Sequence, residues 1–534
     1  ESGALYADLR RTALAAQQPV TGTTFAFESV SEGVEVFAEW RWWFDGPLPE
    51  LHSAFSLSLP PGQVATFRPG SGARPTLERS GNAWTWTLDD QPARRPESLA
   101  PEPGDIGACL FVTTRDTLGA PPLPANGPAR FRSWGEVASW LDALETPQCV
   151  VTPEIAARAG ALTAGAPDTL ARLAALARDV QRTNYVQVTL GLERGAGYRP
   201  HPAAQVMAAG YGDCKDKANL FCALARAAGL EAFMVSVEAE NRDHVVPDWP
   251  SPSQFDHCIV LVRVPPGTRR PAVFRHPSLG PVMAFDPTDP CTAFGDLPRD
   301  EQGSWALVSA ASGGTLVRLP VASPESARMS RAMDATLSAQ GALEAHVEER
   351  SIGQSAASER AAHRQSATEY RNGLEQWLAG DGASVELTRY DAAEDSVTGE
   401  FRLELDFRAP LFARIAGGRL MTFRPALLSP RVENALVDSA RTSPLSLEAS
   451  CFSESVSVHL PEGWRVDDPP ATIDRNTGFG RMHAEWRVSP GLLTFVRAVR
   501  VETTTLPATR YAEVRDFFAA ERQATNEPVV LIAD

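Results

Sequence analysis

The sequence Gly-Tyr-Gly-Asp-Cys-Lys-Asp-Lys-Ala, residues 210–218, decides how this chain folds. Its two glycines permit a tight turn, and Asp213 is a good N-cap for a helix that begins directly after it. Apolar residues then return at helical spacing until another glycine ends the pattern. Cys214 is therefore predicted to lie in the first turn of a helix. The positive end of the helix dipole favours the thiolate over the thiol there, and the thiolate is the nucleophilic form of cysteine.

A nucleophilic cysteine needs a base and a group that orients the base, and two later motifs supply candidates. His257 lies in Phe-Asp-His-Cys-Ile-Val-Leu-Val, residues 255–262, whose apolar and β-branched residues are typical of a buried strand. Asp286 lies in Met-Ala-Phe-Asp-Pro-Thr, residues 283–288, an apolar strand that ends at a proline. Each residue alone also fits an ordinary role, as a core histidine or a turn-forming aspartate. Their occurrence in this order after Cys214 favours a Cys-His-Asp site.

Residues 212–218, 255–257 and 285–288 resemble the motifs of the transglutaminase-like superfamily. More narrowly, they are similar to those of its bacterial multidomain members, in which a papain-type core sits between two β-rich domains. Residues 198–200 and the proline-rich residues 96–103 are also similar to that subfamily. The resemblance implies a multidomain α+β fold, with a papain/transglutaminase-like α+β core between two mainly antiparallel β-sandwich domains.

The same resemblance implies roles for individual residues. Cys214 would be the nucleophile, His257 the general base and then the general acid, and Asp286 the residue that orients the imidazole. The backbone N–H of Cys214 would supply one oxyanion-hole donor, and the second donor in relatives is a side chain from an upstream segment. The candidates for this second donor are Tyr185, Gln187 and Gln205.

Charged residues surround Cys214 within the motif. They are Asp213, Lys215, Asp216 and Lys217. Asp213 is predicted to cap the helix, and the other three recur in the motif of the subfamily. We expect them to form a local ion-pair lattice that holds the turn, rather than to take part in catalysis.

The chain has 534 residues, which predicts about three domains. Residues 1–130 contain short strands separated by turn residues, followed by a proline-rich linker, and predict a β-sandwich. Residues 131–311 are predicted to form the transglutaminase-like catalytic core, with helix starts capped by Ser133, Thr152 and Asp168. Residues 312–534 predict a second β-sandwich, with one helical insertion near 356–378 and another near 508–524.

Composition narrows the range of partners. The chain carries 50 Lys and Arg against 66 Asp and Glu, a net charge of −16, and has no basic run, which disfavours nucleic-acid binding. Its apolar runs are far shorter than the ~20 residues that span a bilayer, so membrane insertion is not expected. Seven cysteines without a Cys-x-x-Cys pair, and no His-Glu-x-x-His motif, predict neither a disulfide scaffold nor a zinc site. No cofactor is implied.

The predicted chemistry is acyl transfer through a thioester on a protein, peptide or peptidoglycan-like amide. Water as acceptor gives a peptidase or amidase, and an amine gives a transglutaminase; hydrolysis is favoured because it needs no dedicated amine site. The alternative is a non-catalytic adhesion or scaffolding protein that retains the fold, although a scaffold has no need of a buried triad. A third interpretation is a metal-dependent enzyme in which His257 and Asp286 are metal ligands. The resemblance also implies export to the periplasm or cell surface, and the oligomeric state is left open.

Overall fold

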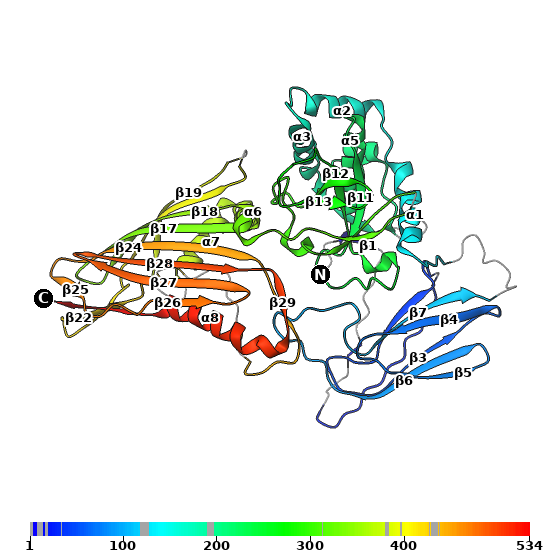
Figure 1. The fold of residues 1–534 in the computed structure, drawn as a ribbon, viewed down its shortest axis with the longest axis horizontal. Coiled ribbons are helices and arrows are strands. Elements are labelled where there is room, and N and C mark those ends of the chain that lie inside the picture. Colours follow the sequence, from blue (N-terminus) through cyan, green and yellow to red (C-terminus); the bar gives the residue numbers. More distant parts are fainter. Residues whose placement is uncertain are drawn as a thin grey trace.

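The computed structural model describes residues 4–7, 14–15, 20–33, 35–117, 128–189, 197–311, 313–379, 384–395, 398–426, 428, 436 and 438–533. Three β-containing regions follow one another along the chain (Figure 1). In this view the blue N-terminal sheets lie below the green core, and the yellow-to-red C-terminal region extends to its left. The multidomain α+β architecture predicted from the sequence is confirmed.

The N-terminal region consists of two small antiparallel sheets around one apolar core. One has the order β2 (Glu39–Trp43), β7 (Cys109–Asp116), β4 (Gln63–Pro69), and the other β3 (Glu50–Ser58), β6 (Ala83–Gln91), β5 (Thr76–Ser80). Phe44, Trp86 and Leu110 are fully buried between them. Facing sheets that share a core are the packing of a small β-sandwich.

The core region is built on a six-stranded antiparallel sheet. Its strand order is β13 (Val273–His276), β14 (Gly280–Phe285), β12 (His257–Arg263), β11 (Ala232–Val237), β15 (Trp305–Val308) and β16 (Leu316–Arg318). Because β16 pairs with β15, the predicted boundary at residue 311 falls within this sheet. Strand β1 (Ala4–Ala7) also joins this region, through parallel pairing with β9 (Gln187–Thr189), although the sequence predicted it to be part of the N-terminal domain.

Five α-helices of the described residues belong to the core. They are α1 (Trp134–Glu145), α2 (Pro153–Thr163), α3 (Thr169–Gln181), α4 (Ala203–Ala209) and α5 (Cys214–Ala227). The side chains of Ser133, Thr152 and Asp168 accept hydrogen bonds from first-turn amides, which confirms the three predicted helix starts. Helix α5 packs on strands β11 and β12, and the helices α2, α3 and α4 pack on α5. Its side chains Phe221 and Leu224 are fully buried in the resulting core.

The C-terminal region is dominated by one eight-stranded sheet. Its order is β19 (Glu386–Glu394), β20 (Phe401–Ala409), β18 (Leu343–Ser351), β17 (Arg328–Leu337), β24 (Ser450–His459), β28 (Leu492–Val501), β27 (Gly480–Ser489) and β26 (Ile473–Asn476). Among these described strands, only β17 and β24 pair in parallel. Burial alternates along most of the strands, so one face of the sheet lies against a core.

Helices and short strands cover that face. The helices are α6 (Gly353–His363), α7 (Ala367–Ala379) and α8 (Tyr511–Asn526). The short strands are β21 (Arg414–Ala416), β22 (Leu420–Phe423), β30 (Val529–Ala533), β25 (Trp464–Val466), and the pair β23 (Leu445–Leu447) and β29 (Thr504–Leu506). The single helix predicted near 356–378 is two helices, because residues 364–366 break it. The large sheet is therefore covered by helices as well as by a second, smaller sheet.

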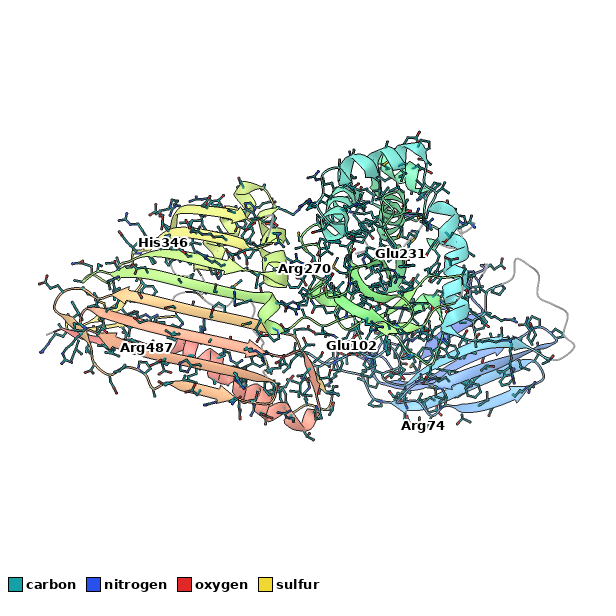
Figure 2. The ribbon with its side chains drawn as sticks, turned by 45° about the horizontal axis from the view of Figure 1, so that its top comes forward. Arg74, Glu102, Glu231, Arg270, His346 and Arg487 are labelled. Atoms are coloured by element: carbon teal, nitrogen blue, oxygen red, sulfur yellow. The ribbon has the colours of Figure 1, made fainter. Side chains whose placement is uncertain are left out.

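The proline-rich segment after β6 lies where the three regions meet. Figure 2 places Glu102 near the centre of the molecule, between Arg74 of the N-terminal sheets and His346 of the C-terminal sheet. The backbone oxygen of Glu102 accepts a hydrogen bond from Asn241 of the core at 2.6 Å. Glu97 accepts hydrogen bonds from the backbone of Thr442 and Ser443 in the C-terminal region. No helix of the described residues is long and apolar enough to cross a membrane.

Candidate active site

The turn that carries Cys214 needs both of its glycines. Gly210 has φ +72°, a left-handed conformation that ends α4 and suits glycine. A Cβ atom at Gly212 would lie 2.7 Å from the Cβ of Asp216, which is too close for any side chain. Asp213 then caps α5: its carboxylate accepts from the Asp216 amide at 3.2 Å, and the Asp216 carboxylate accepts from the Asp213 amide at 3.3 Å. This reciprocal cap places Cys214 at the first position of the helix, as the sequence predicted.

His257 and Asp286 lie at the same edge of the core sheet. His257 is the first residue of β12, and Asp286 directly follows β14. The two strands are antiparallel neighbours, with Val260 opposite Phe285, so the start of one meets the end of the other. Because α5 packs on β12, its N-terminus brings Cys214 to this edge.

The three side chains meet at this edge of the sheet. The Nε2 atom of His257 lies 3.3 Å from Oδ2 of Asp286. The charge of Cys214 acts on the imidazole together with that of Asp286, so the sulfur is near the ring. Because Nε2 faces Asp286, Nδ1 is the ring nitrogen available to the sulfur. The structure therefore brings together the three candidate residues that the sequence separates.

Protonation in this series is set by burial and by neighbouring charge. Burial would lower the pKa of His257, but hydrogen bonds and charges from Asp286 and Cys214 outweigh it and hold that pKa well above its ordinary value. Burial would raise the pKa of Asp286, yet His257 and Thr288 bring it below its ordinary value. At neutral pH the pair is therefore imidazolium and carboxylate. An imidazolium beside Cys214 is the partner that a thiolate requires.

The other six cysteines lie in different surroundings. Burial raises the pKa of each of their thiols, which keeps them protonated and unreactive. These residues are Cys109, Cys149, Cys222, Cys258, Cys291 and Cys451. Cys214 is partly accessible and contacts a positively charged imidazole, which marks it as the candidate nucleophile.

Thr288 and Glu301 are two residues of the site that the sequence analysis did not assign. The Thr288 amide donates to Oδ1 of Asp286 at 2.7 Å, and its hydroxyl lies 2.8 and 2.9 Å from the two carboxylate oxygens. Thr288 belongs to the motif after Asp286, and a donor two residues after an aspartate is a common turn signal. Glu301 gives no such signal, because it lies among charged and polar residues that suggest an exposed turn.

Glu301 is nevertheless buried beside the imidazole. It ends a short 3-10 helix (Arg299–Glu301) and is only 2% exposed. Its Oε1 atom lies 3.8 Å from Nε2 of His257, and its carboxyl group lies in the same cluster as that of Asp286. Burial, followed by the charge of Asp286, holds the pKa of Glu301 well above its ordinary value, so this acid is protonated at neutral pH.

The cluster of His257, Asp286 and Glu301 is compact enough to be considered as a cation site. One ligand atom from each lies within 4.8 Å of the others. Metal binding would require both the imidazolium proton and the Glu301 proton to leave, and Nε2 would have to exchange Asp286 for the ion. The charges of the cluster are already balanced by these two protons.

The charged residues of the motif are mostly structural. Lys215 pairs with Asp213, and Asp216 accepts hydrogen bonds from the amide and Nδ1 of His201 at 2.7 and 3.0 Å. Lys217 departs from the expected ion-pair lattice: its buried Nζ donates to the backbone oxygen of Thr183 at 2.7 Å. Burial lowers the pKa of Lys217 to about 8, and Asp286 is the charge that opposes this shift.

The three oxyanion-hole candidates are placed differently. Tyr185 in β8 (Asn184–Tyr185) lies opposite Gly212 in β10 (Tyr211–Gly212), two residues before Cys214. The side chain is 46% exposed, and its partial desolvation, followed by the charges of Cys214 and Asp213, raises the pKa of Tyr185, so its hydroxyl keeps its proton. Gln205 is exposed on α4 and Gln187 lies in β9; no hydrogen bond of the described residues joins either to Cys214.

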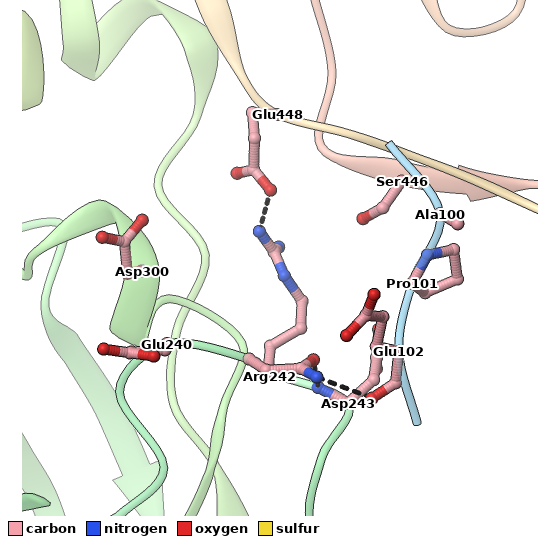
Figure 3. Close-up of a pocket in the computed structure, with 10 residues that line it drawn as sticks. Ala100, Pro101, Glu102, Glu240, Arg242, Asp243, Asp300, Ser446 and Glu448 are labelled. Atoms are coloured by element: carbon pink, nitrogen blue, oxygen red, sulfur yellow. Dashed lines mark hydrogen bonds and ion pairs between the residues drawn. The ribbon is translucent and has the colours of Figure 1, made fainter. Parts of the chain in front are cut away.

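A cavity of about 280 Å³ lies away from the triad, at the junction of the three regions (Figure 3). Arg242 of the core reaches across it to Glu448 of the C-terminal region. Its other charged lining residues are Glu102, Glu240, Asp243 and Asp300. Cys214, His257 and Asp286 do not line this cavity, although Asp300, which does, directly precedes Glu301.

Two family models match parts of this chain. Residues 156–268 match the transglutaminase-like superfamily, and residues 419–531 match DUF3858, a domain of unknown function with a solved structure. The first match includes Cys214 and His257 but ends before Asp286. No curated protein matches the chain.

Two solved structures are similar to the chain. One, from Parabacteroides distasonis, is described as a "putative protease"; it is 12% identical, has a TM-score of 0.56, and the match covers 93% of this chain and 76% of that chain. Another, from Cytophaga hutchinsonii, is described as a "putative cysteine protease"; it is 10% identical, with a TM-score of 0.21, and the match covers 53% and 78% of the two chains. The Parabacteroides structure shows a shared fold over nearly the whole chain. The part of the chain from residue 156 to residue 268 is similar to the transglutaminase-like superfamily.

Proposed function

We propose that this protein is a cysteine peptidase or amidase that cleaves an amide bond through a thioester on Cys214. The observation that carries the proposal is the position of His257, which hydrogen-bonds to Asp286 and lies close enough to Cys214 for the charge of the sulfur to act on the ring. A scaffold would have no use for this arrangement, since it leaves a buried imidazolium beside a partly accessible sulfur.

Each step follows from the protonation of the site. The Cys214 sulfur attacks the amide carbonyl carbon, forming a C–S bond and a tetrahedral oxyanion. As the C–N bond breaks, the imidazolium of His257 gives its proton to the leaving amine. His257, now neutral, takes a proton from water, and the hydroxide attacks the thioester. The acid product leaves, and the thiolate and imidazolium are restored.

Asp286 and the helix start serve this sequence in different ways. Asp286 holds the ring through Nε2, so that Nδ1 stays directed to the sulfur and the incoming amide. Within the described part of the chain, the backbone N–H of Cys214 donates to no protein acceptor, and it lies at the positive end of α5. It is therefore free to donate to the oxyanion.

Tyr185 is the second oxyanion donor that we propose. Its hydroxyl stays protonated, and its strand pairs with the residues directly before Cys214. Replacing Tyr185 by Phe removes only the hydroxyl. Loss of one oxyanion donor typically lowers kcat by about 10²–10³-fold, with little change in KM. A variant Y185F with wild-type kcat would remove Tyr185 from this role.

Hydrolysis of a peptide is the reaction we favour over transfer to an amine. Water needs no acceptor site, and the similar structure from Parabacteroides is described as a protease. The purified protein should be incubated with a mixture of unstructured peptides, with and without an added primary amine, and the products identified by mass spectrometry. The expected products are shortened peptides with free carboxyl ends, whether or not the amine is present. Products that carry the amine would make the protein a transglutaminase.

Two cysteine variants make the assay specific. Cys214→Ala should abolish cleavage, whereas Cys291→Ala, at another partly accessible cysteine, should leave cleavage unchanged. Cleavage that survives in Cys214→Ala would overturn the proposal. Binding of peptides without cleavage, equal in the wild type and in Cys214→Ala, would favour the scaffold.

A further inference from the structure

Glu301 lies deep in the site but outside the Cys-His-Asp series. The segment that follows β14 returns to the site at residues 299–301 and buries the Glu301 side chain beside His257 and Asp286. A glutamate buried at this depth needs either a cation, a set of N–H donors, or a proton. The neighbours of Glu301 decide between these three.

No N–H donor serves this carboxyl group. Its Oε2 atom is buried without a hydrogen-bond partner among the described residues. Its side chain lies with those of Asp286 and His257 in a cluster whose ligand atoms are within 4.8 Å of one another, and its Oε1 atom is 3.8 Å from Nε2 of His257, beyond hydrogen-bond distance. Two buried carboxyl groups this close together repel each other unless one of them carries a proton.

The proton belongs on Glu301. Asp286 receives the amide and hydroxyl of Thr288 and faces the imidazolium, all of which stabilise its charged form. The charges of two other acids, Asp286 and Asp289, oppose the ionisation of Glu301, and the charge of His257 favours it. Lys217 directs its charge at Asp286 and therefore also favours the ionised form of Asp286.

We propose that Glu301 is a positioning residue of the catalytic site: as a neutral acid it donates a hydrogen bond to Asp286 and holds that carboxylate against Nε2 of His257. The inference rests on the proposed function, because the proton it places on Glu301 serves to hold Asp286 in position for the proposed catalysis by His257 and Cys214. A donor on Asp286 stabilises its ionised form and keeps the imidazolium paired. Glu301 itself does not contact the sulfur or the substrate.

Two substitutions separate the hydrogen bond from the burial. Glu301→Gln keeps an N–H donor at the same position, whereas Glu301→Leu keeps the volume and removes the donor. Asp300→Asn is the matched control, because it removes the neighbouring, exposed carboxylate. Thermal unfolding of each purified variant checks that it is folded.

The readout is the pH dependence of Cys214 alkylation by iodoacetamide, measured between pH 4 and 8 without substrate. The alkylation rate falls at low pH as the thiolate is protonated, and this fall is the acid limb of the profile. In Glu301→Leu the acid limb should move up by about one pH unit, because Asp286 loses one hydrogen bond to a charged group and is protonated more easily. With a cleaved peptide, kcat should fall about tenfold with little change in KM. Glu301→Gln and Asp300→Asn should keep the wild-type limb and kcat.

The inference would be overturned if Glu301→Gln and Glu301→Leu had the same pH profile and kcat. It would also be overturned if the acid limb of Glu301→Leu stayed at the wild-type pH. Neither result would contradict the proposed function. Wild-type Cys214 that is alkylated no faster than a free thiol would overturn both the inference and the proposed function. These results are distinguishable, because the wild-type measurement tests the nucleophile and the comparison of variants tests Glu301.

Discussion

Two clusters of buried charged side chains in the described part of the chain differ in what surrounds them. In the core, His257, Asp286 and Glu301 lie beside a partly accessible thiol. In the C-terminal sheet, a second cluster is completely enclosed and has no nucleophile in it. The comparison shows which property of a buried charge indicates a reactive site.

The enclosed cluster is a row across four neighbouring strands. Glu349, Arg331, Glu454 and Arg497 lie opposite one another on β18, β17, β24 and β28. Successive residues are joined at 2.9, 3.0 and 2.8 Å, and none of the four side chains is exposed by more than 1%. Phe452 stacks on both guanidinium groups. Two cations and two anions thus neutralise one another within the row.

The core cluster is balanced only through bound protons. It has one base and two acids, and the pKa values of the two acids are shifted in opposite directions. Its members therefore hold protons that can be moved near neutral pH, whereas an arginine–glutamate row holds none. Burial of charge alone does not indicate catalysis. A catalytic site is indicated when ionised and protonated groups are buried together next to a nucleophile.

The largest expected effect is on the chemistry of the core cluster. Replacing His257 by Gln keeps an N–H donor for Asp286 but removes the acid and base. We expect kcat/KM for peptide cleavage to fall by about 10²–10⁴-fold, since that is what a general acid–base contributes. The free energy of unfolding should change by less than about 1 kcal/mol, because a hydrogen bond to Asp286 is retained. If kcat/KM falls by less than tenfold, His257 is not a general acid–base, and the proposed difference between the core cluster and the enclosed row is wrong.

The second prediction breaks the enclosed row. Arg331→Met should lower the free energy of unfolding by about 3–5 kcal/mol, since it leaves buried carboxylates uncompensated. The double variant Arg331→Met with Glu349→Met leaves one matched pair and should recover part of that loss. Urea unfolding measures both, and the alkylation rate of Cys214 in folded protein should not change. A double variant no more stable than the single one would contradict the account of the row.

A further buried acid, outside both clusters, sharpens the comparison, because it titrates without a catalytic neighbour. Glu145 at the end of α1 is buried, and burial raises its pKa to about 8. From about pH 4.5 to about 8, the folded chain therefore keeps a proton that the unfolded chain has lost. The free energy of unfolding should fall across this range as the pH rises.

Glu145→Gln removes this titration. The variant should exceed the wild type in free energy of unfolding by at least about 1 kcal/mol at pH 8, and the difference should disappear toward pH 4.5. Thermal or urea unfolding at several pH values measures it. A difference that does not depend on pH would mean that Glu145 is not protonated in the folded state.

The smallest effect concerns the segment between Asp286 and Glu301. Gln354 of α6 donates to Thr292 at 3.1 Å and accepts from the Arg299 amide at 3.2 Å, so the C-terminal region supports this segment. Gln354→Ala should cost about 1–2 kcal/mol in local stability and increase amide hydrogen exchange in residues 287–302. Unchanged exchange there would show that the C-terminal region does not stabilise the core cluster.

Local features of this fold could be predicted from the sequence, because their causes are local. The capping residues Ser133, Thr152, Asp168 and Asp213 act on amides two or three positions away, and all four helix starts lie where these residues predict. The convergence of Cys214 with His257 was also predictable, but only through resemblance to a known family.

Features that depend on distant parts of the chain could not be predicted. Strand β1 pairs with β9, and β16 joins the core sheet, because of partners that no local pattern specifies. Glu301 resembles an exposed turn residue in sequence and becomes part of the site only because its segment folds back over β12 and β14. The Arg331 row is likewise defined by register between strands far apart in the chain.

The most direct test of the central claim is the rate at which iodoacetamide alkylates Cys214 at pH 6, located by peptide mass spectrometry and compared with a free cysteine. If His257 holds the sulfur as a thiolate, Cys214 should react at least about tenfold faster than the free thiol, and His257→Gln should remove the difference. Reaction of Cys214 at the rate of the free thiol, unchanged by His257→Gln, would contradict the account.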